Sequence, residues 1–370
     1  MKAFGIIFCD HYSDNAPKNE LTQHRTPAAL PFAGRYRTID FSLSDMVNAG
    51  IKDIGVICKE NYGSLMDHMG SGEAWDLHCK KGGIKVLTPL YRPELTATLR
   101  GRLDALRAVK GYIADQSAEL VVMAFGGTVA SIDLKAMIRT HLEKKAYLTM
   151  AYSEIPAGLG EMVVHPDAED RIESITYVHE PNRPSHKVAL GTCVMLKQDL
   201  LAFLDEADNN DYTNMNRELI QKNLPTRNII AYQHTDYARI IRTVEDYFAA
   251  AMDMLNPKLK KELFPAERPV YTKVKDSVPT LYDFNAAAEN SLIADGCVIK
   301  GTVKNSVLFR GVTVEEGAVV EDSVIMQKTV IGKNAKVRRT IADKNVTVSE
   351  GCELQGAPAL PFVIGKGKKV

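Results

Sequence analysis

The stretch Gly311–Val330, with the sequence GVTVEEGAVVEDSVIMQKTV, carries a small or apolar residue at every sixth position. The same spacing continues on both sides, with a slip of one residue after Val330, and glycine or asparagine recurs where such a chain must turn. No α-helix has a period of six, whereas hexapeptide repeats are typical of a parallel β-helix with three faces per coil. The predicted face positions are Ile293, Ile299, Val312, Ala318, Val324, Val330, Ala335, Ile341 and Thr347, and the predicted corners are Gly311, Gly317, Gly332, Asn334, Asn345 and Gly351.

Upstream of the repeat, short apolar runs alternate with segments of helical spacing. This alternation indicates βαβ units and a Rossmann-like α/β fold with a mainly parallel sheet. Asp40 and Asp133 stand where helix N-caps are expected. The predicted strands are Lys2–Phe8, Ile54–Cys58, Ile84–Leu87, Leu120–Phe125, Tyr147–Tyr152, Ile172–Val178, Val188–Leu196 and Asn228–Tyr232, and the predicted helices are Phe41–Asn48, Arg102–Ile113, Leu134–Lys144 and Thr243–Leu255.

Three parts of the chain follow from these patterns. Residues 1–255 are expected to form the α/β domain, residues 256–290 an extended linker with four prolines, and residues 291–370 the β-helix domain. In doubly wound sheets, ligands bind beyond the carboxyl ends of the strands. We therefore expect a site in the segments that follow Phe8, Leu87 and Phe125.

The composition is that of an ordinary globular protein of 370 residues, in which 46 basic and 46 acidic side chains give a net charge of +0. A nucleic-acid or anionic-membrane binder normally carries an excess of basic residues, so we expect neither partner. The N-terminal apolar run is too short for a signal peptide or a membrane span. The six cysteines form no CxxC pair, which fits a reducing, cytoplasmic compartment and no zinc site.

The sequence can be compared with the residues that two kinds of transferase site require. Acyltransferases with hexapeptide β-helices use a histidine base on a coil, but all nine histidines lie at or before His234. A nucleoside triphosphate needs a glycine-rich turn after the first strand, because backbone N–H groups must approach its phosphates closely. The chain has no glycine from Ile6 to Ala33. Asp10 and Asp14 in this turn would repel phosphate charge by about 1 kcal/mol or more, so the residues alone argue against both sites.

The segment 30–57, LPFAGRYRTIDFSLSDMVNAGIKDIGVI, resembles the corresponding segment of ADP-glucose pyrophosphorylases (glucose-1-phosphate adenylyltransferases). This resemblance covers essentially the whole chain and implies a nucleotidyltransferase domain followed by a left-handed β-helix, in a tetramer that serves glycogen synthesis. Members of the family join ATP and glucose 1-phosphate, with Mg²⁺ held by two aspartates. The shorter matches are ELIQKNL (218–224), PVYT (269–272), NSVLFRGV (305–312), SVIMQ (323–327) and IADKNV (341–346).

The functional motifs of that family are altered where they would touch phosphate or metal. By the resemblance, the two metal-binding aspartates fall on Gly127 and Ile240, and the lysine that binds the sugar phosphate falls on Glu180. The glycine-rich loop is replaced by Cys9–Asn15. The family includes GlgD-type regulatory subunits, which assemble with a catalytic homologue and alter its kinetics, and this sequence resembles them. We therefore expect no catalytic residue and no bound metal or cofactor in this chain, with Mg²⁺ held by the catalytic partner.

Several charged residues remain candidates for ligand contacts. Arg25 and Asp104 would belong to a remnant of the substrate cleft, although the helix dipole explains Asp104 equally well. The resemblance places a basic residue of the GRYR segment at an anion or sugar-phosphate effector site near the β-helix, and arginines of the β-helix could complete that site. Surface ion pairing is the alternative for all of these arginines. The effector candidates are Arg35, Arg37, Arg310, Arg338 and Arg339.

Three functions stay open at this point. The first is a catalytically degenerate regulatory subunit that packs against a catalytic homologue in a heterotetramer, or against itself. The second is an active adenylyltransferase whose Mg²⁺ is held by other ligands, for example Asp10 or Asp14. The third is a sugar-phosphate sensor without catalysis.

Overall fold

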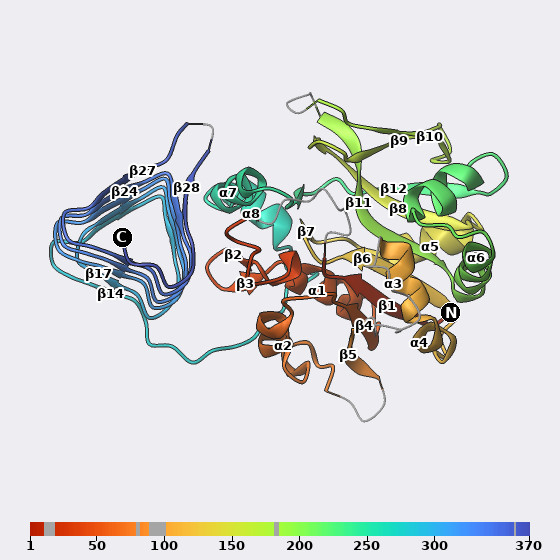
Figure 1. The fold of residues 1–370 in the computed structure, drawn as a ribbon, viewed down its shortest axis with the longest axis horizontal. Helices are drawn as coiled ribbons and strands as arrows, with labels where there is room; N and C mark the ends of the chain where they lie inside the picture. The colour runs from red at the N-terminus through yellow and green to blue at the C-terminus, as the bar shows by residue number, and fades with distance from the viewer. Residues whose placement is uncertain (11–18, 79–81, 89–100, 181–184, 359) are drawn as a thin grey trace.

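The α/β part of the chain is built on one sheet of nine strands (Figure 1). The computed structural model describes residues 1–10, 19–78, 82–88, 101–180, 185–358 and 360–370. Four parallel strands form one half of the sheet, in the order β5 (Gly83–Leu87), β4 (Asp53–Ile57), β1 (Ala3–Phe8) and β6 (Leu120–Phe125), with β5 at the edge. The runs AFGIIF and LVVMAF are buried between layers, which explains why they are continuously apolar and not alternating.

The other half of the sheet mixes parallel and antiparallel pairs. β11 (Ser185–Leu196) pairs antiparallel with β6 and with β8 (Leu148–Pro156), and β12 (Ile229–Gln233) pairs parallel with β8. β9 (Met162–Pro166) and β10 (Ile172–Tyr177) form an antiparallel pair at the far edge. The four parallel strands confirm the predicted Rossmann-like sheet, and every predicted strand is present. The sequence analysis did not find β9.

Helices cover both faces of the sheet and enclose two apolar cores. α1 (Ile39–Asn48), α2 (Gly63–Met69) and α5 (Leu134–Glu143) pack on one face, whereas α3 (Arg102–Ala108), α4 (Lys110–Ala114) and α6 (Lys197–Asn209) pack on the other. The single helix predicted over residues 102–113 is wrong, because Val109, with φ −107° and ψ 14°, separates α3 from α4. No helix in the described ranges is long and apolar enough to cross a membrane.

The two predicted N-caps have different outcomes. The Asp133 carboxylate accepts a hydrogen bond at 2.9 Å from a backbone N–H in the first turn of α5, which confirms that cap. Asp40 is not a cap, because α1 begins at Ile39 and Asp40 lies inside its first turn. The buried Asp40 carboxylate instead accepts the Arg37 N–H at 3.0 Å and lies 2.6 Å from Nε2 of His68. Asp40 therefore ties α1 to α2.

The C-terminal part is a left-handed parallel β-helix whose three faces are three parallel sheets (Figure 1). Through the middle of the β-helix the register advances by 17 residues per coil, as when Ser323 N–H donates to Oγ of Ser306. The step is shorter from β16 to β19 and longer from β25 to β28. A period of 17 residues is one residue shorter than three hexapeptides, so one repeat in such a coil has five residues. This shorter repeat explains the slip in the sequence pattern. The sheets contain β14 (Leu281–Tyr282), β17 (Val298–Ile299), β20 (Thr313–Val314), β23 (Val330–Ile331) and β26 (Thr347–Val348); β15 (Ala287–Glu289), β18 (Thr302–Lys304), β21 (Val319–Glu321), β24 (Lys336–Arg338) and β27 (Glu353–Gln355); and β16 (Leu292–Ile293), β19 (Val307–Leu308), β22 (Val324–Ile325), β25 (Thr340–Ala342) and β28 (Phe362–Ile364).

The corners of the coils confirm the prediction with one exception. Gly332 has no positive φ; a Cβ there would instead lie 2.7 Å from the carbonyl oxygen of Val348 in the next coil. Charged residues also occupy corners, since Asp322, Lys328 and Arg339 have φ values of 44°, 58° and 48°. The predicted corners with positive φ are Gly311, Gly317, Asn334, Asn345 and Gly351.

The segment 256–290 is less extended than predicted. It begins with α8 (Pro257–Leu263), because the Asn256 side chain caps the Lys258 N–H at 3.0 Å and proline suits the first helical position. Its last residues already form β14 and β15. Only the residues between α8 and β14 have no regular structure. They connect the two domains and run from beside α2 to β14 (Figure 1). The expectation of an extended linker is therefore wrong at both ends, while the domain boundaries themselves stay a prediction.

A third apolar core joins the two domains. α7 (Val244–Asp253), the predicted helix near residues 243–255, starts with a capping box formed by Thr243 and Asp246. Its Tyr247 is fully buried and donates from Oη to the Pro31 carbonyl oxygen at 2.7 Å. Phe309 of the β-helix belongs to the same core. The β-helix is therefore packed on the α/β domain, with β28 facing α7 in Figure 1.

Candidate functional site

Two short strands form an antiparallel ladder just after β6. β7 (Thr128–Ala130) pairs with β13 (Ala238–Ile240), with Ile240 opposite Thr128. Ile241 N–H donates to the Gly127 carbonyl oxygen at 3.1 Å. The structure therefore brings together Gly127 and Ile240, the two positions to which the resemblance assigns metal-binding aspartates.

Neither of these two positions fits a Mg²⁺ ion. A Cβ at Gly127 would lie 2.6 Å from the ring of Phe125, so this ring fills the space of a side chain there. The Ile240 side chain is buried in the apolar core. Magnesium binds through oxygen ligands, and these two side chains offer none. Among the residues that the structure describes, no group of three or more His, Cys, Asp or Glu side chains could hold a metal ion.

The loop beyond β1 supplies the other acidic candidates. Asp10 is buried, and its Oδ2 accepts the Lys59 N–H at 2.6 Å, which fixes the carboxylate on the neighbouring strand end. Asp14 and most of the segment Cys9–Asn15 lie outside the described residues. Glu180, at the position of the family's sugar-phosphate lysine, is exposed.

α3 begins at the carboxyl edge of the sheet and places two charged residues there. Asp104 lies in the first turn of α3 and pairs with Arg107 at 3.2 Å. The guanidinium of Arg102 lies 5.5 Å from the ring centre of Phe8 and 5.1 Å from that of Phe125. Sequence analysis did not single out Arg102. The ends of β1 and β6 are therefore covered by a cation that stacks on two aromatic rings.

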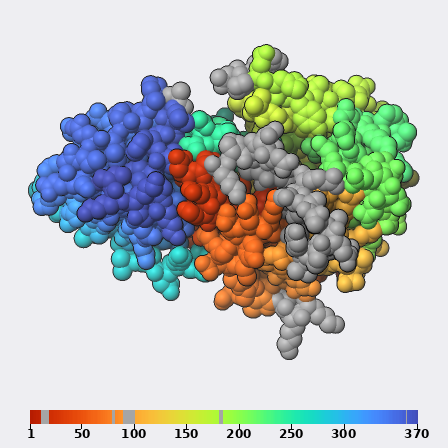
Figure 2. Space-filling model, viewed as in Figure 1, coloured from red at the N-terminus to blue at the C-terminus, as the bar shows by residue number. Residues whose placement is uncertain are grey.

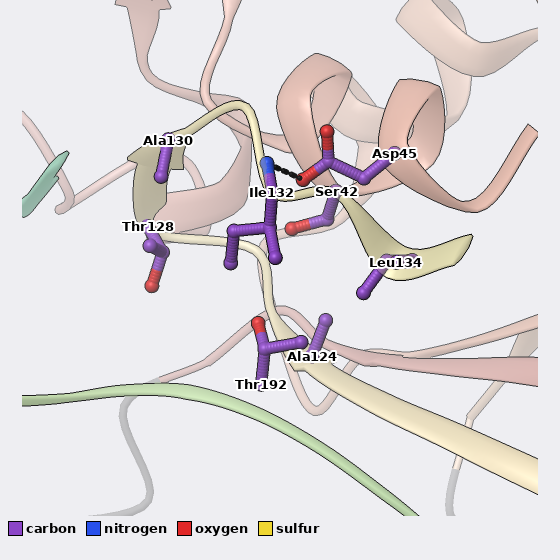
Figure 3. Close-up of a pocket in the computed structure, with 8 residues that line it drawn as sticks. All are labelled: Ser42, Asp45, Ala124, Thr128, Ala130, Ile132, Leu134 and Thr192. Atoms are coloured by element: carbon purple, nitrogen blue, oxygen red, sulfur yellow. Dashed lines mark hydrogen bonds between the residues drawn. The ribbon is translucent and has the colours of Figure 1, made fainter. Parts of the chain in front are cut away.

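A small cavity of about 10 Å³ lies beside β7, which is space for about one water molecule (Figure 3). Asp45 of α1 contributes a buried carboxylate to its wall. Its Oδ2 accepts the Ile132 N–H at 3.0 Å, while its Oδ1 has no hydrogen-bond partner in the described ranges. Burial raises the pKa of Asp45 well above its usual range, although the Ile132 N–H and the charge of Arg268 act in the opposite direction. The lining residues are Ser42, Asp45, Ala124, Thr128, Ala130, Ile132, Leu134 and Thr192.

Replacing Asp45 with asparagine is expected to stabilise the protein by an amount that grows with pH. Because the pKa of Asp45 is higher in the folded than in the unfolded state, the folded protein binds one proton more between the two values. The free energy of unfolding then falls with rising pH by up to about 1.4 kcal/mol per unit, starting near the unfolded value of about 4. An asparagine side chain cannot ionise, so urea unfolding should show a larger advantage of the variant at pH 8 than at pH 5.

The matched control for this prediction is Asp322→Asn at an exposed corner of the β-helix, where the carboxylate stays in water in both states. A stability difference between the Asp45→Asn variant and the parent that is constant from pH 5 to pH 8 would contradict the assignment.

A larger cavity of about 460 Å³ opens between the two domains. Its walls come from the turn of β2 (Pro31–Phe32) and β3 (Tyr36–Arg37), from α2, from the linker and from one corner of the β-helix. Figure 2 shows the red segment near the N-terminus against the blue surface of the β-helix at this junction. No carboxylate is present among the described residues that line the cavity, whereas seven lining residues are basic: Arg35, Arg37, Lys273, Lys275, Arg310, Lys328 and Lys344. We call this space the basic cavity.

Three of the predicted effector residues, Arg35, Arg37 and Arg310, meet in the basic cavity. The four lysines were missed. One signal could have found Lys344, because Arg310, Gln327 and Lys344 follow one another at the 17-residue period of the coils. The guanidinium of Arg37 is bound by uncharged groups: its Nη1 donates to Oγ of Ser64 at 2.7 Å and to the Ala29 carbonyl oxygen at 3.2 Å.

The other predicted arginines do not line the basic cavity. Arg25 is buried at the domain junction, where its Nη2 lies 2.9 and 2.7 Å from the two carboxylate oxygens of Asp343. Arg338 pairs with Glu321 at 2.8 Å on an outer face of the β-helix. Arg339 lies over the ring of Phe248 at 5.2 Å. The structure thus places Arg25 in an interdomain ion pair, Arg338 in a surface ion pair and Arg339 against a buried ring of α7.

Comparisons with known proteins cover both parts of the chain. A family model described as nucleotidyl transferase matches residues 19–255, and one described as GlmU-like, C-terminal hexapeptide matches residues 278–357. The glycogen biosynthesis protein GlgD of Bacillus subtilis (strain 168) is 32% identical over 351 residues, which is 94% of this chain and 92% of that protein. The glucose-1-phosphate adenylyltransferase of Bacillus cereus (strain Q1) is 30% identical over 335 residues, or 90% and 89% of the two chains. That of Fervidobacterium nodosum is 32% identical over 343 residues, or 90% and 81%.

Proposed function

The chain belongs to the glucose-1-phosphate adenylyltransferase family, and we propose that within it this protein is a catalytically degenerate regulatory subunit that acts in glycogen biosynthesis. In this role it modulates a catalytic homologue that makes ADP-glucose and pyrophosphate from ATP and glucose 1-phosphate. A cytoplasmic location is part of the proposal, since the cysteines in the described ranges are free thiols.

The observation that carries the proposal is the ladder of β7 and β13. The positions of both metal-binding aspartates are neighbours there, as a shared metal site requires, yet they hold Gly127 and Ile240. Two further changes support the loss of catalysis: an acidic residue, Glu180, stands where the family binds a sugar phosphate, and the chain has no glycine-rich loop after β1. Without the metal and the lysine, negative charge that develops during phosphoryl transfer loses the two compensating charges that the family supplies.

The basic cavity supports the regulatory half of the proposal. Its volume lies within the usual range for small-molecule sites, roughly 300–1,000 Å³. Seven cationic side chains, of which Arg310 pairs with Asp295 at 2.9 Å, suit a ligand with more than one negative charge, such as a sugar phosphate. Because its walls come from both domains, a ligand there could favour one arrangement of the domains over another. This cavity is the proposed effector site.

The first coil of the β-helix supports assembly with a partner. Phe284 is 97% exposed, and Val278, Leu281 and Tyr282 around it are also exposed. β14, β15 and β16, which end the three sheets of the β-helix there, have a neighbour on one side only. Exposed apolar residues beside open strand edges mark a docking surface. We propose that a catalytic homologue, or a second copy of this chain, packs there.

The isolated chain is expected to release pyrophosphate from ATP and glucose 1-phosphate with Mg²⁺ at least about 1,000-fold more slowly than a catalytic homologue, because it lacks the charges that stabilise the transition state. A coupled pyrophosphate assay on both proteins at equal concentration measures this. Gly127→Asp is the informative variant, and it should stay inactive because Ile240 still supplies no oxygen ligand for a metal ion.

Turnover by the isolated chain at a rate near that of the homologue would favour the alternative of a rebuilt metal site. The structure offers that alternative little support, since no group of three or more His, Cys, Asp or Glu side chains in the described ranges could hold a metal ion. The sensor without catalysis is favoured by the basic cavity alone, and it differs from the regulatory subunit in predicting no effect on a partner.

A further inference from the structure

We propose that an anion that binds in the basic cavity makes the amine of Lys344 take up a proton, so that the affinity of the site falls as the pH rises above neutrality. This inference rests on the proposed role of the basic cavity as an effector site. It adds a regulation of that site by pH and assigns the regulation to one residue.

The first step is the position of Lys344. It follows Asp343 at a corner of the β-helix, and its own N–H donates to Oδ1 of Asp343 at 2.7 Å. The Asp343 carboxylate is already engaged by Arg25 through both oxygens. The Lys344 amine has no carboxylate partner among the residues that the structure describes, and its side chain is only partly exposed. The neighbouring carboxylate is therefore already shared with Arg25, and the Lys344 amine has no ion pair of its own in the described ranges.

The second step is the field around this amine. Burial, followed by the positive charges of Arg37 and Arg25, lowers the pKa of Lys344 to about 7, while Asp343 acts in the opposite direction. Burial and neighbouring cations also lower the pKa of Lys275. The charged and titratable groups that face the Lys344 amine or line the same space are Arg25, Arg35, Arg37, His68, Lys273, Lys275, Arg310, Lys328 and Asp343.

The third step is the response to a ligand. In the empty cavity, like charges repel one another, and the Lys344 amine relieves the repulsion by giving up its proton. A bound anion reverses the sign of the local field, which favours the charged amine again. Anion binding and protonation are therefore coupled, and each strengthens the other by the same factor. Above neutrality the empty site must first regain a proton, so binding weakens with rising pH.

The test is calorimetric titration of the full-length chain with sulfate, which stays a dianion between pH 7 and pH 9. We expect the dissociation constant to be on the order of tenfold higher at pH 9 than at pH 7. Titrations at pH 8 in two buffers of different ionisation enthalpy should show net proton uptake by the complex.

Three variants assign the effect to one side chain. Lys344→Arg keeps its charge at every pH used and should bind sulfate equally well at pH 7 and pH 9. Lys344→Met should bind sulfate more weakly than the parent at pH 7 but about equally at pH 9, and its complex should take up no proton. The variant does not alter the contact between His68 and Asp40, the other titratable pair beside the basic cavity. Lys328→Met, the matched control, removes a charge from the same cavity and should weaken binding at every pH while proton uptake persists. Thermal unfolding confirms that each variant is folded.

Each other result overturns the inference in a distinct way. Sulfate binding that is independent of pH and buffer would leave the anion site standing and remove the proton coupling. A pH dependence that persists in both Lys344 variants would assign the proton to another group. An absence of sulfate binding would overturn the inference together with the proposed effector site, whereas the regulatory effect on a partner is measured separately by its kinetics.

Discussion

Replacing Asp343 with asparagine is expected to lower the free energy of unfolding by about 3–5 kcal/mol, because the change leaves the buried charge of Arg25 without a partner. The two side chains are 1% and 4% exposed, and the ion pair joins the β-helix to the α/β domain. Asparagine has nearly the shape of aspartate, so the loss isolates the charge. Urea unfolding followed by circular dichroism measures it.

Two comparisons separate this ion pair from ordinary ones. Adding Arg25→Met to the Asp343→Asn variant removes the unpaired charge and should recover part of the lost stability. Glu353→Gln breaks an exposed pair with Lys336 on the same β-helix and should change the stability far less, because water and salt screen exposed ion pairs. If Asp343→Asn and Glu353→Gln had the same small effect, the buried pair would not hold the domains together.

Replacing Lys328 with glutamate is expected to weaken the binding of a sugar bisphosphate to the isolated chain by about 30-fold, equivalent to about 2 kcal/mol. The substitution changes the charge of the basic cavity by two units and places a carboxylate where the described lining has none. Lys328 lies at an exposed corner, so the fold should tolerate the change. Calorimetric titration with fructose 1,6-bisphosphate measures the effect.

Arg338→Glu is the control for the basic cavity. Arg338 was an effector candidate by sequence, but it pairs with Glu321 and does not line the basic cavity. Its substitution should change the dissociation constant less than about twofold. Equal losses in the Lys328→Glu and Arg338→Glu variants would mean that the overall charge of the β-helix, and not the basic cavity, attracts the ligand.

The β-helix could be predicted in detail because each coil repeats the contacts of the previous coil. Val307, Val324 and Ile341 stack at one register, so a single pattern of apolar residues encodes the whole domain. The central strands could be predicted for a similar reason, since burial between layers makes them apolar throughout. The caps were harder to predict, as Asp40 shows, because its partner His68 lies on another helix.

The basic cavity could be predicted only in part because its residues come from distant segments. Lys273 reaches it since the linker passes α2, where its amine donates to the Asp67 carbonyl oxygen at 2.5 Å. Arg25 was expected in a cleft, but its partner Asp343 is 318 residues away in the chain. No local pattern contains such a pairing. The site of Gly127 and Ile240 could be predicted better than the basic cavity. The resemblance pointed to both positions, and the structure places them next to each other.

The most direct measurement is the rate of pyrophosphate release by a catalytic homologue alone and in a purified complex with this chain, with and without a sugar bisphosphate. A chain carrying Phe284→Arg, which charges the exposed end of the β-helix, is the matched control for assembly. We predict that the complex has a changed maximal rate or effector response, and that Lys328→Glu in this chain removes the effector part of the change. Identical kinetics of the homologue with and without this chain would contradict its role as a regulatory subunit.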